Sequence, residues 1–311
     1  MTAGWVASGV RSRAMSGRRL GAGASRRLAS LPGLAEAVDA LAVTPYGHLV
    51  RPGQTLAEAQ HAVSSTLLWH LRVLGGWVPH GDARILRVLA GGFEIANTDE
   101  RLRELMGAES EPPFRLGSLG TAWNRIATAG SPAQVRDALT RSVWGDPGAD
   151  TAAALHFGMR LSWASRVAAV VPKARPWAGG AAALLVAREV IIAGQRPTAA
   201  AVRIAAPLLG SAWVAAGTVT ALTVALPHDA RWALAAVSDP VELWQAEAAW
   251  WARVERDGFA LLRQPVTSAA PVIGMAAVLA VDSWRVRAAL AVAARGGALA
   301  PGALEAFDAV A

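Results

Sequence analysis

Two groups of acidic residues are the side chains in this sequence with the types and spacing for acid–base chemistry. The first group is Asp99, Glu100 and Glu104, and the second is Glu247, Glu255 and Asp257. General acid–base catalysis needs two carboxyls in different environments across a cleft, so that their pKa values move apart. Both groups have arginines close in sequence, namely Arg101, Arg103, Arg253 and Arg256. We therefore expect solvated ion pairs at helical spacing rather than a catalytic pair.

Other catalytic signatures are absent from the sequence. Lys173 lies in V-P-K-A-R-P with no glycine run before it, so it does not belong to a phosphate-binding P-loop. The six histidines include no pair at helical metal-ligand spacing, and there is no cysteine. We expect no catalytic residue, no metal and no cofactor.

The chain is basic, but its basicity is weak evidence for a partner. Its net charge is +7, yet Lys173 is the only lysine among 30 basic residues, which is typical of a composition bias. The first thirty residues contain no acid and six arginines, at Arg11, Arg13, Arg18, Arg19, Arg26 and Arg27. A basic arm for nucleic acid or anionic lipid, or a transit peptide, would fit this segment. A helix with arginines facing solvent or an acidic partner is favoured, with Trp5, Val6, Val10, Met15 and Leu20 on its apolar side.

Helix start and stop signals run through the sequence. Thr55 and Glu58 form a capping box, and Gly75-Gly76 ends the helix that follows. Ser131-Pro132 and Asp239-Pro240 are further helix starts, because each joins a capping side chain to a proline. The β-branched stretches are short and lack alternation. We predict an all-α fold.

The residues from Ile204 to Pro227 form a run of 24 uncharged positions, long enough to span a membrane. The run contains proline, glycines and threonines, and much of the rest is alanine, so its insertion energy would be marginal. A buried core segment is favoured, and an integral membrane protein spanning with residues 204–227 is the alternative.

A short phrase occurs twice. Residues 35 to 47 read A-E-A-V-D-A-L-A-V-T-P-Y-G and residues 133 to 145 read A-Q-V-R-D-A-L-T-R-S-V-W-G, so Asp39 and Asp137 lie 98 positions apart. Chance matching in an alanine-rich chain is one interpretation. The other is a helical unit used more than once, which predicts that Tyr46 and Trp144 occupy equivalent places near the end of a helix.

Tryptophan is abundant, with 13 copies against one tyrosine. In the helix after Asp239, a stripe of Val241, Trp244, Ala248 and Trp251 predicts packing against another helix. Alternatively, Trp250 or Trp251 anchors a protein partner, since tryptophan is enriched in interface hot spots.

Several segments together resemble a known family. The segments are R-S-R-A-M-S-G-R-R-L, L-A-E-A-V-D-A-L-A-V-T-P-Y-G and F-E-I-A-N-T-D-E-R-L-R-E-L, followed near the end by L-W-Q-A-E-A-A-W-W-A-R-V-E-R-D-G and V-D-S-W-R-V-R-A-A-L. Together they resemble the C subunit of V/A-type rotary ATPases, equivalent to eukaryotic subunit d. The likeness is thinnest from about 148 to 238. Where the family has glutamate followed by Asn-Leu-Arg near its end, this chain has Asp282, Ser283, Trp284 and Arg285, whereas Glu94 and Asn97 keep the pattern.

The resemblance implies a funnel of about three similar helical subdomains, at 1–110, 111–200 and 201–311. It implies a non-catalytic central-stalk socket, peripheral on the cytoplasmic face of the membrane, that links the stalk subunits to the membrane c-type ring in proton or sodium transport. Arg11, Arg13, Arg18, Arg19, Trp250 and Trp251 are the candidate partner contacts, and no nucleic-acid partner is expected. A helical adaptor that binds nucleic acid through the basic first helix is a further alternative.

Overall fold

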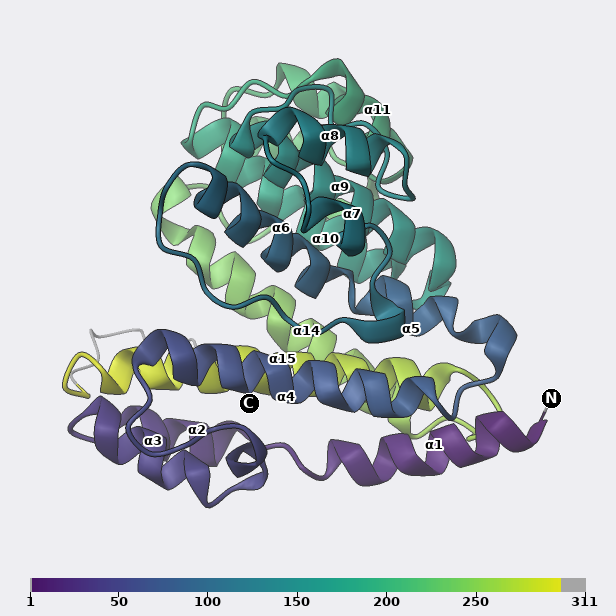
Figure 1. The fold of residues 1–311 in the computed structure, drawn as a ribbon. Coiled ribbons are helices and arrows are strands. Elements are labelled where there is room, and N and C mark those ends of the chain that lie inside the picture. The colour runs from purple at the N-terminus through teal and green to yellow at the C-terminus, as the bar shows by residue number, and fades with distance from the viewer. Residues whose placement is uncertain (1, 298–311) are drawn as a thin grey trace. The chain divides into compact units, whose positions relative to one another are not determined.

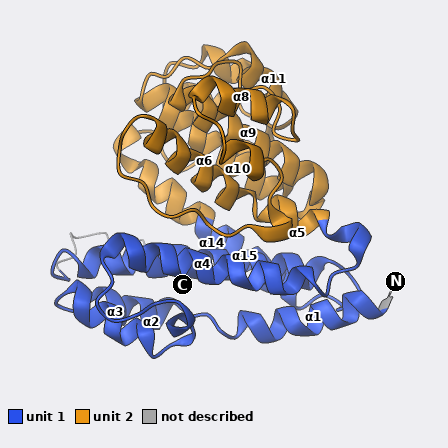
Figure 2. Cartoon of the chain, in the orientation of Figure 1, with its two compact units in different colours: residues 1–83, 251–311 blue, residues 84–250 orange. Residues whose placement is uncertain are grey.

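The computed structural model describes residues 2–297, and all regular secondary structure in that range is helical (Figure 1). The predicted all-α class is confirmed. The chain forms two compact units, residues 1–83 with 251–311 and residues 84–250 (Figure 2). The finer division into three subdomains stays a prediction, and the end of its third part, residues 298–311, lies outside the described residues.

Unit 1 joins the two ends of the described chain. Its central helix is α15 (Ala270–Ala293), which packs against the four helices of the N-terminal part. Those are α1 (Thr2–Ser16), α2 (Ala22–Ala29), α3 (Leu34–Ala42) and α4 (Leu56–Gly75). Apolar side chains of α2, α3 and α4, including Leu28, Leu41 and Val63, bury against Val286 and Leu290 of α15.

Unit 2 is built around α9 (Ala152–Val170), which contacts α5, α6, α10 and α11. The unit comprises α5 (Arg84–Leu89), α6 (Gly91–Leu105), α7 (Trp123–Ile126), α8 (Pro132–Thr140), α10 (Arg175–Val186), the π-helical η5 (Ala187–Ile192), α11 (Ala199–Leu209), α12 (Val219–Ala225) and α13 (His228–Arg231). One further helix, α14 (Leu243–Leu262), begins in unit 2 and ends in unit 1.

The helix-start signals at Thr55 and Ser131 correspond to real helix ends. Thr55 accepts a hydrogen bond from the Glu58 N–H, and the Glu58 carboxylate accepts one from the Thr55 N–H, so the predicted capping box starts α4. Ser131 caps α8 in the same manner through the N–H of Gln134. Each cap satisfies an N–H that the first helical turn leaves without a backbone acceptor.

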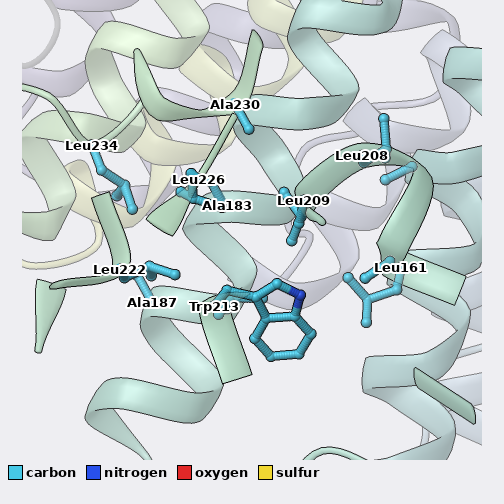
Figure 3. Packing of buried hydrophobic residues seen from close by; sticks show 14 of the residues in the cluster. Leu161, Ala183, Ala187, Leu208, Leu209, Trp213, Leu222, Leu226, Ala230 and Leu234 are labelled. Atoms are coloured by element: carbon cyan, nitrogen blue, oxygen red, sulfur yellow. The ribbon is translucent and has the colours of Figure 1, made fainter. Parts of the chain in front are cut away.

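The uncharged run at 204–227 is divided among several short elements. It contains the second half of α11, the 3-10 turn η6 (Ala212–Ala215) and α12. No helix within residues 2–297 is long and apolar enough to cross a membrane. Leu208, Leu209, Trp213 and Leu222 bury instead among leucines and alanines (Figure 3).

Two predicted helix faces are wrong in detail. In α1, Val6 and Val10 are exposed, and the buried face consists of Ser8, Gly9, Ser12 and Ser16. Each of these serine hydroxyls donates to a carbonyl three or four residues earlier in its own helix, so it can be buried without an unsatisfied donor.

The stripe predicted for α14 differs because the helix starts later than its cap suggests. Asp239 caps only a 3-10 turn, η7 (Pro240–Glu242), and α14 begins at Leu243. Because a 3-10 turn is wound more tightly than an α-helix, the residues before Leu243 point in a different direction from the one that α-helical spacing predicts. Val241 and Trp244 are consequently exposed.

Candidate functional site: two buried carboxylates at a repeated turn

The repeated phrase forms the same turn in both units. After α3, the Thr44 hydroxyl donates to the Leu41 carbonyl at 2.6 Å and accepts from the Tyr46 N–H at 3.2 Å. After α8, Ser142 does the same with the Leu139 carbonyl at 2.7 Å and the Trp144 N–H at 3.1 Å. Each residue of the second turn lies 98 positions after its counterpart. Both aromatic rings are buried, so the structure places Tyr46 and Trp144 in equivalent surroundings.

In unit 1, the ring of this turn reaches a buried carboxylate on α15. The Tyr46 hydroxyl donates to Asp282 Oδ2 at 2.7 Å. The same carboxylate accepts the backbone N–H of Leu20 at 2.8 Å and that of Gly21 at 2.7 Å, directly before α2. Asp282 therefore ties the turn after α3 to the start of α2, and each contact is a charge-assisted hydrogen bond.

In unit 2, Glu94 on α6 occupies the corresponding place. The Trp144 indole N–H lies 3.3 Å from Glu94 Oε2 and also donates to the Thr121 hydroxyl at 3.0 Å. The carboxylate accepts the N–H groups of Thr121, Ala122 and Trp123, directly before and at the start of α7, and the Thr121 hydroxyl at 2.6 Å. We call the arrangement of buried acid, aromatic donor and helix-start N–H groups the carboxylate clamp.

A second polar side chain lies three residues after each acid. Asn97 exchanges two hydrogen bonds with the backbone of Phe114, at 2.7 Å to its N–H and 2.9 Å to its carbonyl. Arg285, fully buried, binds Glu255 of α14 through both terminal nitrogens at 3.1 and 2.8 Å. Breaking such a buried pair leaves an uncompensated charge, so Arg285 and Glu255 fix α15 against α14.

The clamp environments shift the pKa values of neighbouring groups. Burial, followed by the Asp282 carboxylate, raises the pKa of the Tyr46 hydroxyl well above its usual value. Burial lowers the pKa of the Arg166 guanidinium, which lies 4.7 Å from the centre of the Trp144 ring, and the charge of Glu94 partly opposes that shift. Both shifts have burial as their largest cause, because low-dielectric surroundings disfavour the charged form.

The acidic groups singled out by spacing form ion pairs of two kinds. Arg101–Glu104, Arg103–Glu100 and Arg253–Asp257 are surface pairs at helical spacing, as expected. Glu255 is different, since its partner Arg285 is buried. Asp99 is also different: it lies 3.0 Å from His156 Nδ1, and His156 Nε2 accepts from Arg160.

Three of the four arginines predicted as partner contacts also contact their own unit. The Arg11 guanidinium stacks over Trp77 at 3.5 Å from the ring centre. Arg13 donates to the carbonyls of Leu262 and Gln264. Arg19 donates to the Ser16 carbonyl and lies over the Phe259 ring. Arg18 is exposed.

The two tryptophans predicted as anchors are half-buried. Trp250 donates its indole N–H to the Trp177 carbonyl at 2.9 Å in unit 2. Trp251 stacks on Trp284 of unit 1, with ring centres 5.4 Å apart. Both rings therefore pack within the chain, and their contact with a partner stays a prediction.

Sequence spacing alone missed the residues that complete the clamps. Thr44 and Ser142 precede their aromatic residue by two positions, so the signal was a hydroxyl-x-aromatic-glycine pattern inside the repeated phrase. Asp39 and Asp137, the conspicuous matching pair, are exposed on the helix surface. Thr121 and the N–H donors of Leu20 and Gly21 carry no comparable signal.

Chemically, the clamps bind backbone rather than a substrate. Every carboxylate oxygen of Asp282 and Glu94 accepts at least one hydrogen bond from the protein. No group of three or more histidine, aspartate or glutamate side chains among residues 2–297 is arranged to hold a metal ion. No protein-family model and no curated protein matches this chain.

Proposed function

We propose that this chain is a non-catalytic central-stalk socket subunit of a V/A-type rotary ATPase. Its partners would be the membrane c-type ring and the stalk subunits, and it would be peripheral on the cytoplasmic face of the membrane. It would take part in proton or sodium transport as an accessory subunit, with no catalytic residue of its own.

The observation that carries the proposal is the repeated carboxylate clamp. The family that the sequence resembles is built from repeated helical subdomains, and the clamp is a device found once in each unit. Glu94 keeps the family's pattern together with Asn97, whereas Asp282 stands where the family has glutamate. The repeated arrangement of these side chains is therefore in keeping with a protein built from repeated helical subdomains.

The clamp also suits transmission of torque. A socket must pass a twisting load without its short helices sliding, and buried charge-assisted hydrogen bonds resist that movement better than apolar contacts, which have no directionality. Glu94 ties α6 to the start of α7 and to the turn after α8. Asp282 makes the corresponding links in unit 1.

Co-purification tests the proposal. The full chain, tagged at one end and expressed in its own cells, is captured after solubilisation in a mild detergent, and the bound proteins are identified by mass spectrometry. We expect nucleotide-binding subunits and c-type ring subunits together. An untagged strain is the control for background.

Two results would overturn the assignment. One is capture of the chain without ring and stalk subunits, although a tagged nucleotide-binding subunit brings down a complete motor from the same cells. The other is a nuclease-sensitive association with RNA or DNA, which would favour the nucleic-acid adaptor.

A further inference from the structure

The outer face of α1 carries an apolar stripe that the described residues of unit 1 leave exposed. Val6 is 39% exposed and Val10 is 56% exposed, and Ala3 and Ala14 are exposed on either side of them. Spacings of three, four and four place these four residues along one line of a helix. The opposite face, with Ser8, Ser12 and Ser16, is the one that packs inward.

The inward packing is too close for the helix to rotate. A Cβ added at Gly9 would lie 2.9 Å from the carbonyl oxygen of Val266. Arg13 further ties α1 to the last residue of α14 and to the chain after it, through its hydrogen bonds to the carbonyls of Leu262 and Gln264. The valine stripe is therefore held facing outward, along the edge of unit 1 where Figure 1 shows α1.

Arginines lie on both sides of the stripe. At 100° per residue, Arg13 falls on one side of Val6 and Val10 and Arg11 falls on the other, while the exposed Arg18 lies in the turn directly after α1. Trp77, which is 43% exposed, lies under the Arg11 guanidinium and extends the apolar surface. A helix that lies in a membrane interface likewise places apolar side chains toward the acyl chains and arginines toward the headgroups.

The charge of the segment selects for an anionic partner. Six arginines and no acid precede Glu36, the first acidic residue of the chain. A nucleic acid would be bound mainly through its phosphates and would leave the valines in water. An anionic lipid surface would attract the arginines through its headgroups and would also contact the two valines and Trp77.

We infer that the outward face of α1, with Val6, Val10, Arg11, Arg18 and Trp77, binds the surface of an anionic lipid bilayer. This contact is direct and does not require the other subunits of a motor. Its test with purified chain is therefore independent of the test of the proposed function.

Vesicle co-sedimentation of the purified full chain is the experiment. The vesicles are pure phosphatidylcholine or an equal mixture of phosphatidylcholine and phosphatidylserine. We expect binding to the mixed vesicles that weakens with added salt, and little binding to pure phosphatidylcholine. Replacing Arg11 and Arg18 by glutamine should lower the partition coefficient roughly twenty-fivefold, about fivefold for each arginine.

The valines provide the discriminating variant. Val6→Ser with Val10→Ser leaves the charge unchanged and should lower the partition coefficient roughly tenfold, because two partly buried isopropyl groups are lost from the interface. Val43→Ser with Val224→Ser makes the same chemical change at two other exposed sites and should leave binding unchanged. Arg115→Gln with Arg196→Gln is the matched control for charge, since both arginines are exposed in unit 2.

Circular dichroism establishes that each variant keeps its helical content. Specific loss of vesicle binding with the α1 valine pair supports the inference. The inference is overturned if the purified chain does not bind mixed vesicles at low salt. The inference is also overturned if vesicle binding is lost in the arginine variant but kept in the valine variant. Tight binding of duplex DNA or RNA by the parent chain would then identify α1 as a purely electrostatic surface.

Discussion

Removal of the Glu94 carboxylate should destabilise unit 2 more than any surface change on the same helix. The carboxylate is 2% exposed and accepts the N–H groups of Thr121, Ala122 and Trp123, the Thr121 hydroxyl and the Trp144 indole. A hydrogen bond to a charged group contributes about 1.5–3 kcal/mol, and a buried donor left unpaired costs about 1–3 kcal/mol. These costs are not additive, because water and small shifts relieve part of them.

Two substitutions separate loss of charge from loss of the acceptor. Glu94→Gln keeps one acceptor oxygen, which can stay on the three backbone N–H groups while the new amide faces the Thr121 hydroxyl. We expect it to lower the free energy of unfolding by about 2 kcal/mol, the loss of charge assistance. Glu94→Ala leaves the donors unpaired and should cost about 4 kcal/mol, near the upper end for single substitutions.

Region-resolved measurement is needed because a chain with two units need not unfold in one step. Hydrogen exchange in increasing urea, read by mass spectrometry, should show lost protection in peptides covering residues 121–126 and 132–144. Peptides from unit 1 serve as an internal reference. Glu104→Gln, on an exposed side chain of the same helix, should change stability by no more than about 0.5 kcal/mol.

If the free energy of unfolding of Glu94→Ala lies within about 1 kcal/mol of that of the parent chain, the carboxylate does not hold the start of α7. Unchanged exchange of the Thr121, Ala122 and Trp123 amides in that variant would refute the clamp argument equally, since those amides would then owe nothing to the carboxylate.

Three further predictions concern unit 1. Burial and Asp282 raise the folded-state pKa of Tyr46, so the neutral side chain stabilises the fold fully below about pH 10 and loses this effect as the pH rises through the folded-state pKa. Tyr46→Phe should therefore weaken the dependence of unfolding on alkaline pH, followed by circular dichroism. Burial, followed by the charge of Arg18, lowers the pKa of His70 to about 4. Neutral His70 therefore contributes up to about 3 kcal/mol to the free energy of unfolding above pH ~6.5, and this contribution is lost as the pH falls through the folded-state pKa. His70→Leu should remove that pH dependence in urea titrations between those two pH values. Gly274→Ala places a Cβ 2.5 Å from the Gly258 carbonyl oxygen, where α14 and α15 approach closely, and should lower the free energy of unfolding by about 2 kcal/mol in thermal unfolding. Gly217→Ala is the control, because a Cβ there would have no atom within 4 Å, and it should leave the stability unchanged.

Local signals in the sequence predicted local structure well. The capping box at Thr55 and Glu58 and the cap at Ser131 depend on residues within one helical turn, and both are present. The phrase shared by 35–47 and 133–145 likewise predicted two equivalent turns, because the hydroxyl-to-backbone contacts that shape each turn span only a few residues.

Burial of helix faces was harder to predict. Apolar periodicity assigned Val6 and Val10 to the inner side of α1, but serines that bond their own backbone are as compatible with a close helix contact as valines. The small side chains of Ser8, Ser12 and Ser16 allow α1 to pack closer to the rest of unit 1 than larger side chains would allow. The repeated four-residue spacing of these serines was a usable signal.

The clamps depend on long-range pairing, which no local pattern encodes. Glu94 reaches donors 27 to 50 positions away, all inside the contiguous segment 84–250. Asp282 reaches donors 236 to 262 positions away, so unit 1 cannot form its clamp until α15 has been synthesised and has packed against the first helices. Closing so long a loop costs little more entropy than closing one of moderate length, but it delays the contact. The clamp of unit 2 thus lies within one contiguous segment, whereas the clamp of unit 1 joins segments far apart in the sequence, with Asp282 linking α15 to the residues directly before α2.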